Sequence, residues 1–477
     1  KTMRKRILLL SITLISAVYY IEAQSIRTIK KELQQSIEKH ETELIKTSDA
    51  IWEAAETALL EFKSSKILID HAKRNGFDVE EGVAGIKTAF TASYGSGRPI
   101  IGILGEFDAN AGISQKRKPV KEARIPGGAG HGCGHNLFGT ASLGAAIAIK
   151  EQIEKGNIKG TVIFYGTPAE ETIFAKVWMV REGLFDKLDV CMDWHPGDEI
   201  QAGTQSSKAL VDFRVKFRGN SAHASSDPWN GNSAADAMEL YTTGLNYYRE
   251  HIEPTARIHY QIEKAGDVVN VVPDYAQIWT RLRQNDRAGV DVLYERALDI
   301  AKGAALMTGT TYETKLISGI YEIQVNRTGA TILQKNLETL GEISYSDSEL
   351  NYANTILKET GKPQNGIDGK IYPLKPTLPA QGGSTDVGDV SQVVPTISLG
   401  VTTAASGGPW HSWAVVACTG MSIGHKGMIY AAKALSMTMA DLYKNPSLIS
   451  AVKEDYLKNK KYDKYDPRIL PGPPSLE

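Results

Sequence analysis

Cysteine is scarce in this 477-residue chain, and neither sign of charge dominates. Its three cysteines, Cys133, Cys191 and Cys418, are too few and odd in number for a disulfide framework, so at least one must be free, buried or bound to a metal. The formal net charge of -1 argues against nucleic acid or an anionic membrane as a partner. Beyond the N-terminus, no apolar run is long enough to span a membrane. The remaining composition, 42% hydrophobic and 23% charged, predicts a soluble protein of two domains with a small-molecule partner.

The N-terminus has the pattern of a secretory signal. Arg4, Lys5 and Arg6 precede an apolar run over residues 7–21, after which the chain returns to polar and small residues. This run of about fifteen apolar residues is shorter than the roughly 20 that span a bilayer. We therefore predict a signal peptide at residues 1–24, with a start at Met3, and an exported, periplasmic protein. A retained N-terminal anchor is the alternative.

Hydrophobic patterns divide the rest of the chain into two kinds of structure. Residues 25–208 alternate buried apolar strands with helices, which is typical of a mainly parallel α/β sheet. Residues 209–318 have the order β-α-β-β-α-β, as in a ferredoxin-like α+β domain. Residues 319–450 return to the first domain. We predict a large α/β domain with a smaller domain inserted into it, and a C-terminal tail at residues 451–477 that is poorly ordered beyond Leu457.

Two segments, one in a predicted loop and one at the end of a predicted strand, carry candidate ligands for a metal. Cys133 and His135 stand two apart in a glycine-flanked loop, where thiolate and imidazole together suit a borderline-soft metal. Glu170 and Glu171 come directly after an apolar strand. If the backbone stays extended there, one carboxylate faces a metal and the other a water. The plainer interpretations are a buried structural cysteine and a solvated acidic turn.

Two further histidines occupy similar places. His195 precedes Pro196 at the end of an apolar run, and His411 lies between two tryptophans in a loop of glycine and proline. Each histidine alone is as well explained by simple packing. Together with the thiol and the carboxylates, however, they supply what a two-metal hydrolase needs. Such an enzyme activates a water with its metals, takes the proton with a carboxylate and stabilises the developing oxyanion.

Seven motifs in the order of the sequence carry a resemblance to a known family. They are GEFDA (105–109), HGCGHNLFG (131–139), GTPAEE (166–171), WHPGD (194–198), GNSAHA (219–224), VNVVPD (269–274) and IGHKGM (423–428). Over about residues 30–445 the chain resembles the aminoacylase, hippurate hydrolase and carboxypeptidase superfamily of co-catalytic metallopeptidases. Within it, the HGCGHN, WHPGD and IGHKGM segments are most similar to the branch that holds the B subunits of p-aminobenzoyl-glutamate hydrolases.

The resemblance implies a metal centre and its chemistry. It implies an amidohydrolase that cleaves an N-acyl amino acid, an aminobenzoyl-glutamate-type conjugate or a dipeptide with two divalent metal ions, zinc or manganese, with cobalt as a further option. Glu170 matches the general base, and Asp108 matches an acid that orients a metal ligand. The residues that match the family's metal ligands are Cys133, His135, Glu171, His195 and His411.

In the inserted domain, the resemblance implies contacts with substrate and with other subunits. His223 matches a histidine that reaches the active site of a neighbouring subunit in dimeric relatives. Asn270 and Arg283 match residues that grip the substrate's carboxylate, a task that suits the planar guanidinium. We therefore expect a homodimer formed through the inserted domain, and a further partner subunit remains open.

The chain departs from these relatives in two loops. Residues 172–175 read Thr-Ile-Phe-Ala, where relatives usually have glycines after the paired glutamates. Asn110 and Ala111 stand where Leu-Pro is usual. Both loops are expected to border the site, so the substrate preference is expected to differ more than the metal centre.

Two other classes of function fit these residues less well. A cysteine hydrolase with Cys133 as nucleophile and His135 as base leaves the other three matched ligands without a role. Chelation would leave the activity of a cysteine hydrolase intact and would abolish the activity of a metal-dependent enzyme. A non-catalytic binding protein on the same fold would have no need of Glu170 as a base.

Overall fold

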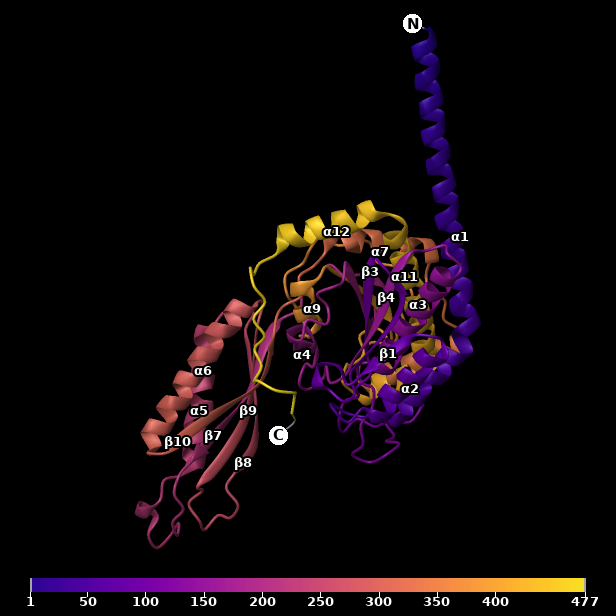
Figure 1. Cartoon of the computed structure of the whole chain (residues 1–477). Coiled ribbons are helices and arrows are strands. Elements are labelled where there is room, and N and C mark those ends of the chain that lie inside the picture. The colour runs from indigo at the N-terminus through magenta and orange to yellow at the C-terminus, as the bar shows by residue number, and fades with distance from the viewer. Residues whose placement is uncertain (1, 476–477) are drawn as a thin grey trace.

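The computed structural model describes the backbone of residues 2–475 and the side chains of residues 26–475. Figure 1 shows two bodies: a large helix-covered sheet, and a smaller domain that projects from it. The predicted signal peptide, residues 1–24, lies outside the residues whose side chains are described, and it stays a prediction. Among the described residues, none of the helices combines the length and apolar character that crossing a membrane requires.

A seven-stranded sheet forms the centre of the large body. Its strand order is β1-β2-β4-β3-β5-β11-β6. The four strands β4, β3, β5 and β11 run parallel, and the outer pairings are antiparallel. The predicted mainly parallel α/β fold is thus confirmed. The strands are β1 (Asp78–Glu81), β2 (Phe90–Ser96), β3 (Ile100–Glu106), β4 (Gly160–Thr167), β5 (Val190–Gly197), β6 (Gln201–Ala202) and β11 (Thr396–Thr402).

Helix α3 (His135–Glu154) packs against β3, β4 and β5 and places a site residue at its first position. A Cβ on Gly139 would approach the carbonyl oxygen of Glu106 to 2.7 Å, so glycine there allows the close approach of helix and strand. The other helices of this body are α1 (Thr2–Ala54), α2 (Phe62–Arg74), α4 (Lys176–Arg181), α7 (Arg327–Leu340), α8 (Asp347–Glu359), α9 (Val387–Val393), α10 (Trp413–Thr419), α11 (Ser422–Lys444) and α12 (Pro446–Asn459).

The smaller body, called the inserted domain below, is a four-stranded antiparallel sheet with two helices. Its strand order, β10-β7-β9-β8, is that of a ferredoxin-like domain, as predicted. Alternate residues of β7 and β9 are buried in a hydrophobic core separate from that of the large body. The elements are β7 (Ala209–Arg218), α5 (Ala234–Tyr248), β8 (Arg257–Ala265), β9 (Tyr275–Gln284), α6 (Arg287–Thr308) and β10 (Thr311–Ile320).

The tail beyond α12 contacts both bodies, so the prediction of poor order is wrong for the described residues. Arg468 forms an ion pair of 2.6 Å with Asp291 on α6. Farther along, the indole of Trp178 in the large body donates a hydrogen bond of 3.0 Å to the carbonyl of Gly472. The proline-rich composition gave no sign of this order, because the tail is held by contacts with distant parts of the chain and not by contacts within itself.

Candidate metal centre

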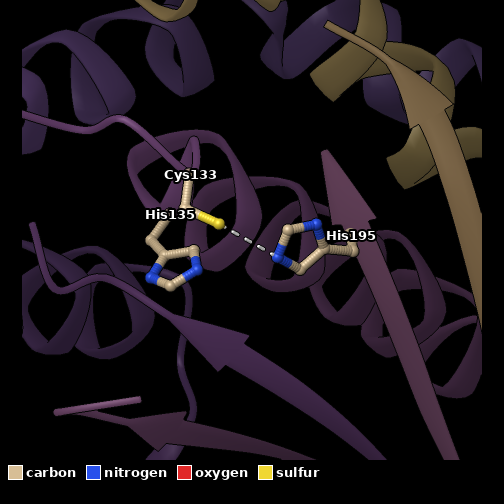
Figure 2. A group of neighbouring side chains, drawn as sticks. All are labelled: Cys133, His135 and His195. Carbon is tan, nitrogen blue, oxygen red and sulfur yellow. Dashed lines mark hydrogen bonds between the residues drawn. The ribbon is translucent and has the colours of Figure 1, made fainter. Parts of the chain in front are cut away.

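A thiol and two imidazoles meet beside the end of β5. Figure 2 shows the sulfur of Cys133 pointing at His195, 3.4 Å from its Nε2, with the ring of His135 close by. One possible ligand atom from each of these three residues lies within 4.8 Å of the others. Gly134 has a φ of +77° and caps the start of α3, which turns the chain sharply between the thiol and His135.

The imidazole of His195 is oriented by the backbone carbonyl of the next residue, Pro196. Nδ1 of His195 lies 2.7 Å from the carbonyl oxygen of Pro196, an acceptor that fixes the proton on Nδ1. The lone pair of Nε2 then faces Cys133. A hydrogen bond of this kind on the outer nitrogen is the usual way in which proteins aim a histidine at a metal.

A second group of ligand atoms shares the same sulfur. Cys133, Glu171 and His411 also bring one such atom each within 4.8 Å of the others. Nε2 of His411 lies 3.5 Å from Oε2 of Glu171. The backbone of His411 adopts a φ of +52° and donates its N–H to the carbonyl of Gly132, 3.1 Å away. All five residues matched to metal ligands therefore lie in two groups that meet at one thiol.

Two carboxylates at the end of β3 hold the ring of His135. Oδ1 of Asp108 lies 2.9 Å from Nδ1, and Oε2 of Glu106 lies 3.0 Å from Nε2. The other oxygen of Asp108 accepts the backbone N–H of Glu171 at 2.9 Å. Asp108 thus connects the two ligand groups. Although burial alone would lower it, Glu106 and Asp108 raise the pKa of His135 well above its ordinary value.

The two glutamates lie in a turn, and the expectation of extended backbone there is wrong. Ala169 and Phe174 have φ values of +60° and +64°, and the N–H of Phe174 donates to the carbonyl of Ala169 at 2.9 Å. The turn directs Glu171 to the ligand group and leaves Glu170 beside it. Among the described residues, Glu170 has no ion-pair partner. Burial, followed by the charges of Glu106 and Glu171, raises its pKa well above the ordinary value.

The buried polar atoms of this cluster fit a metal ion. Oε1 of Glu171 is buried without a hydrogen-bond partner, and Nε2 of His135 and Oε2 of Glu106 face each other at 3.0 Å without forming a hydrogen bond. Buried atoms of this kind are costly unless a cation takes their lone pairs. Burial and the charge of Glu171 raise the pKa of the Cys133 thiol well above its ordinary value. His135 is already engaged by Glu106 and Asp108, so it is not free to act as a base for the thiol. The arrangement therefore disfavours a cysteine hydrolase and suits residues that hold a metal.

A buried ion network lies beneath the cluster. Nζ of Lys176 lies 2.6 Å from Glu106 and 2.7 Å from Asp386, and all three side chains are buried. Although burial alone would lower it, Asp386 and Glu106 raise the pKa of Lys176 above its ordinary value. Glu106 and His135 also form a third group of possible ligands with Glu170. Because Lys176 already neutralises Glu106, we interpret that carboxylate as a support for His135.

Replacing Lys176 by methionine is expected to destabilise the protein by about 3–5 kcal/mol, since it leaves two buried carboxylates without their cation. Chemical unfolding of the variant would measure this change in the free energy of unfolding. The exposed Lys66, paired only with Asp70 on the same helix, offers a matched control. Lys66→Met is expected to change stability by less than about 0.5 kcal/mol. Equal effects of both substitutions would contradict the network's role.

A cleft of about 610 Å³ opens above the cluster and is bounded on one side by the inserted domain. Arg281 and Arg283 of β9 both line it. Arg283 donates a hydrogen bond of 3.1 Å to the hydroxyl of Ser384 and has no carboxylate partner among the described residues. Arg281 is held by the buried Asp212, at 3.1 Å, and its guanidinium stands 5.3 Å from the centre of the Phe174 ring. Of these two cations, Arg283 is therefore the freer to bind a ligand's carboxylate.

The other two matched residues of the inserted domain lie elsewhere. His223 and Asn270 are exposed and do not line the cleft. Nδ1 of His223 accepts the backbone N–H groups of Ser225 and Ser226, each at 3.2 Å. Within one chain the structure therefore does not bring these two residues to the metal cluster. Their predicted role, in which His223 serves a neighbouring subunit, stays a prediction.

Sequence reasoning missed three residues that shape the site. Arg281 lies two positions before Arg283 on β9, and Glu106, the last residue of β3, lies two positions before Asp108. A period of two places such pairs on one face, and that signal was available. Lys176 stands in an otherwise apolar segment. No pattern in the sequence indicates that it pairs with Asp386, which lies far along the chain.

Comparisons with known proteins agree with this geometry. Residues 104–353 match the model of peptidase family M20/M25/M40. The chain is 36% identical over 457 residues to the B subunit of p-aminobenzoyl-glutamate hydrolase from Escherichia coli, with 90% of this chain and 95% of that protein covered. It is 28% identical over 427 residues to the human Xaa-Arg dipeptidase, with 86% and 87% covered.

Solved structures share the fold. The aminobenzoyl-glutamate utilization protein of Klebsiella pneumoniae matches with a TM-score of 0.55 at 18% identity, covering 84% of this chain and 98% of that one. A dinuclear metal-binding M20 peptidase from Bacillus subtilis matches with a TM-score of 0.53 at 17% identity, covering 83% and 98%. From the family match, the extent of the first relative's identity and the arrangement of the site, we conclude that the chain belongs to peptidase family M20/M25/M40 and is a hydrolase of amide or peptide bonds.

Proposed function

We propose that this protein uses two divalent metal ions to hydrolyse the amide bond of an N-acyl amino acid or dipeptide. The observation that carries the proposal is the pair of ligand groups that share the sulfur of Cys133. The mixed sulfur, nitrogen and oxygen donors suit zinc, and manganese or cobalt are alternatives. When bound, such ions would polarise the substrate's carbonyl and lower the pKa of water.

The protein's own residues supply the remaining steps. Glu170 lines the cleft beside the ligand groups, from where it accepts the proton of the attacking water and passes it to the leaving nitrogen. Asp108 keeps the ring of His135 and the backbone of Glu171 in place through its two oxygens. Arg283 binds the carboxylate of the leaving amino acid, which orients the scissile bond.

The charge of the cleft supports one substrate class over another. Arg281 and Arg283 line the wall formed by the inserted domain. Arg281 is paired with Asp212, but Arg283 has no carboxylate partner among the described residues. A leaving amino acid with a cationic side chain would meet the like charge of Arg283, whereas an acidic or neutral one would not. We therefore favour substrates of the aminobenzoyl-glutamate type over the Xaa-Arg dipeptides named for a second relative.

We further propose an exported, periplasmic protein that forms a homodimer through the inserted domain. Exposed apolar side chains support an interface near His223 and Asn270, since Trp229 is 77% and Val269 is 99% exposed. A separate partner subunit is a second candidate, because the Escherichia coli hydrolase is named with two kinds of subunit and both are similar to this chain.

A hydrolysis screen with and without chelator tests the proposed function. Metal-loaded protein is expected to hydrolyse p-aminobenzoyl-glutamate or another N-acyl amino acid, to lose this activity after dialysis against a chelator, and to regain it with zinc or manganese. Release of the amino acid, followed by chromatography, is the measurement. Activity that survives complete removal of metal would contradict the proposal and favour a metal-free hydrolase.

Replacing Arg283 by glutamine is expected to lower kcat/KM about 10- to 100-fold, as loss of a hydrogen bond to a charged group predicts. The loss should disappear for a substrate whose terminal carboxylate is converted to an amide. Arg296→Gln, an exposed change on α6, is the matched control and should leave kcat/KM unchanged. Equal losses for acid and amide substrates would show that Arg283 does not bind the carboxylate.

A further inference from the structure

A second cavity, of about 410 Å³, lies at the junction of the two bodies. None of the five residues matched to metal ligands lines it, and it shares only Ser206 and Ile323 with the metal cleft. Its wall includes both places where the chain crosses between the bodies, at Ser206 before β7 and at residues 322–327 after β10. The rest of the wall comes from Asn285, Asp286, residues 377–380, Gln392, Asn459 and Lys461.

Three of the four charged side chains in this wall already have partners. Lys461 forms an ion pair of 3.0 Å with Glu322, which also accepts the hydroxyl of Tyr462 at 3.1 Å. Asp286 accepts the backbone N–H of Gly289 at 2.9 Å and thereby caps α6. Glu322 is therefore already paired with a cation, whereas Asp286 keeps its charge at the start of α6. Among the described residues, neither acid forms an ion pair with Arg327.

Arg327, the fourth charged residue, is different. Among the described residues, its guanidinium has no ion pair or hydrogen bond, and its Nη1 is buried without a partner. When a donor of a charged group is buried and left unpaired, the free-energy cost exceeds the net contribution of an ordinary hydrogen bond. The structure thus leaves one donor of this guanidinium without a partner at the cavity, and a carboxylate oxygen is a group that would satisfy it.

The rest of the wall adds an apolar surface. Leu378, Pro379 and Ala380 face the cavity together with Val325. A volume of a few hundred cubic ångströms, with mostly apolar walls and a few polar groups, is typical of sites for small organic molecules. An inorganic anion would use Arg327 but leave this apolar surface in contact with water.

We propose that the junction cavity is a second binding site, for a small carboxylate with an apolar body, in which Arg327 is the counter-ion. The planar guanidinium pairs with a carboxylate through two parallel hydrogen bonds, and the apolar wall takes the ligand's body. Because the cavity is lined by both crossings, a bound ligand holds the inserted domain in one orientation. The acyl product of the proposed hydrolysis belongs to this class, and that consequence alone rests on the proposed function.

Benzoate and its neutral counterpart benzamide are suitable probes, applied to the metal-loaded enzyme. Calorimetry would measure affinity, and hydrogen–deuterium exchange would locate the site, since benzoate can also enter the metal cleft. Benzoate is expected to protect residues 322–327 and 377–380, and benzamide is not. Arg327→Gln should weaken this binding about 10- to 100-fold. Lys335→Gln, an exposed change on the same helix, should leave it unchanged.

Three results would overturn the proposal. They are equal protection by benzamide, protection confined to segments of the metal cleft, and unchanged affinity in folded Arg327→Gln. Should Arg327→Gln fail to fold, the comparison of the two probes in the unmodified enzyme decides, together with Arg327→Lys. That variant keeps the charge and should retain weakened binding at the same segments. Hydrolysis need not be measured, so failure of this proposal is distinct from failure of the proposed function.

Discussion

Replacing Glu170 by glutamine is expected to lower kcat about 10²- to 10⁴-fold, because the amide cannot accept the proton of the attacking water. The carboxylate lines the cleft and has no ion-pair partner among the described residues, so its loss breaks no structural contact of that kind. Metal content and the unfolding transition should therefore stay close to those of the unmodified protein. Steady-state kinetics and metal analysis on the same preparation would measure both.

A matched control separates this effect from a general change of charge. Glu182 is exposed and, among the described residues, pairs only with its neighbour Arg181, so Glu182→Gln should leave kcat unchanged. A Glu170→Gln variant that keeps full activity with its metal bound would remove Glu170 as the base. A variant that loses its metal would instead place Glu170 among the ligands.

Replacing Cys133 by alanine is expected to remove binding at both metal positions. It should lower kcat by at least as much as Glu170→Gln does. The reason is that its sulfur belongs to both ligand groups, whereas each other ligand belongs to one of these two. Metal analysis after gel filtration should find less than one equivalent per chain. Activity should not return at micromolar zinc.

The other buried cysteines provide the control for that substitution. Cys418 is free and fully buried on α10, and it belongs to none of the groups of possible metal ligands. Cys418→Ala should retain both metals and activity, with at most a modest loss of stability from the missing sulfur. Full metal content in Cys133→Ala would mean that the two ligand groups do not depend on a common thiol.

The strands and the order of elements were predictable because they rest on local patterns. The apolar run that became β4 and the alternating residues that became β7 give clear periods. The ligands were predictable as residue types, since Cys133 and His135 stand in a glycine-flanked motif. Their convergence with His411, which follows them by more than half of the chain, came from the resemblance and not from any local pattern.

The turn around the glutamates was not predictable by the same means. Its closure depends on left-handed backbone at Ala169 and Phe174, a conformation that neither residue type favours. Strain of this kind persists only where the surrounding structure over-determines it. The buried Phe174, which lies against Arg281 of the inserted domain, is such a constraint, and it forms only once both bodies have folded. The tail is a similar case, because its partners lie on α6 and α4.

The most direct test of the central claim is anomalous diffraction at the metal edge from crystals of the metal-loaded protein. The account predicts two peaks, each about 2.3 Å from the sulfur of Cys133 if the metal is zinc. One peak should lie against His135 and His195, and the other against Glu171 and His411. A single peak, or a pair of peaks of which either lies away from that sulfur, would contradict a two-metal centre built on a shared thiolate.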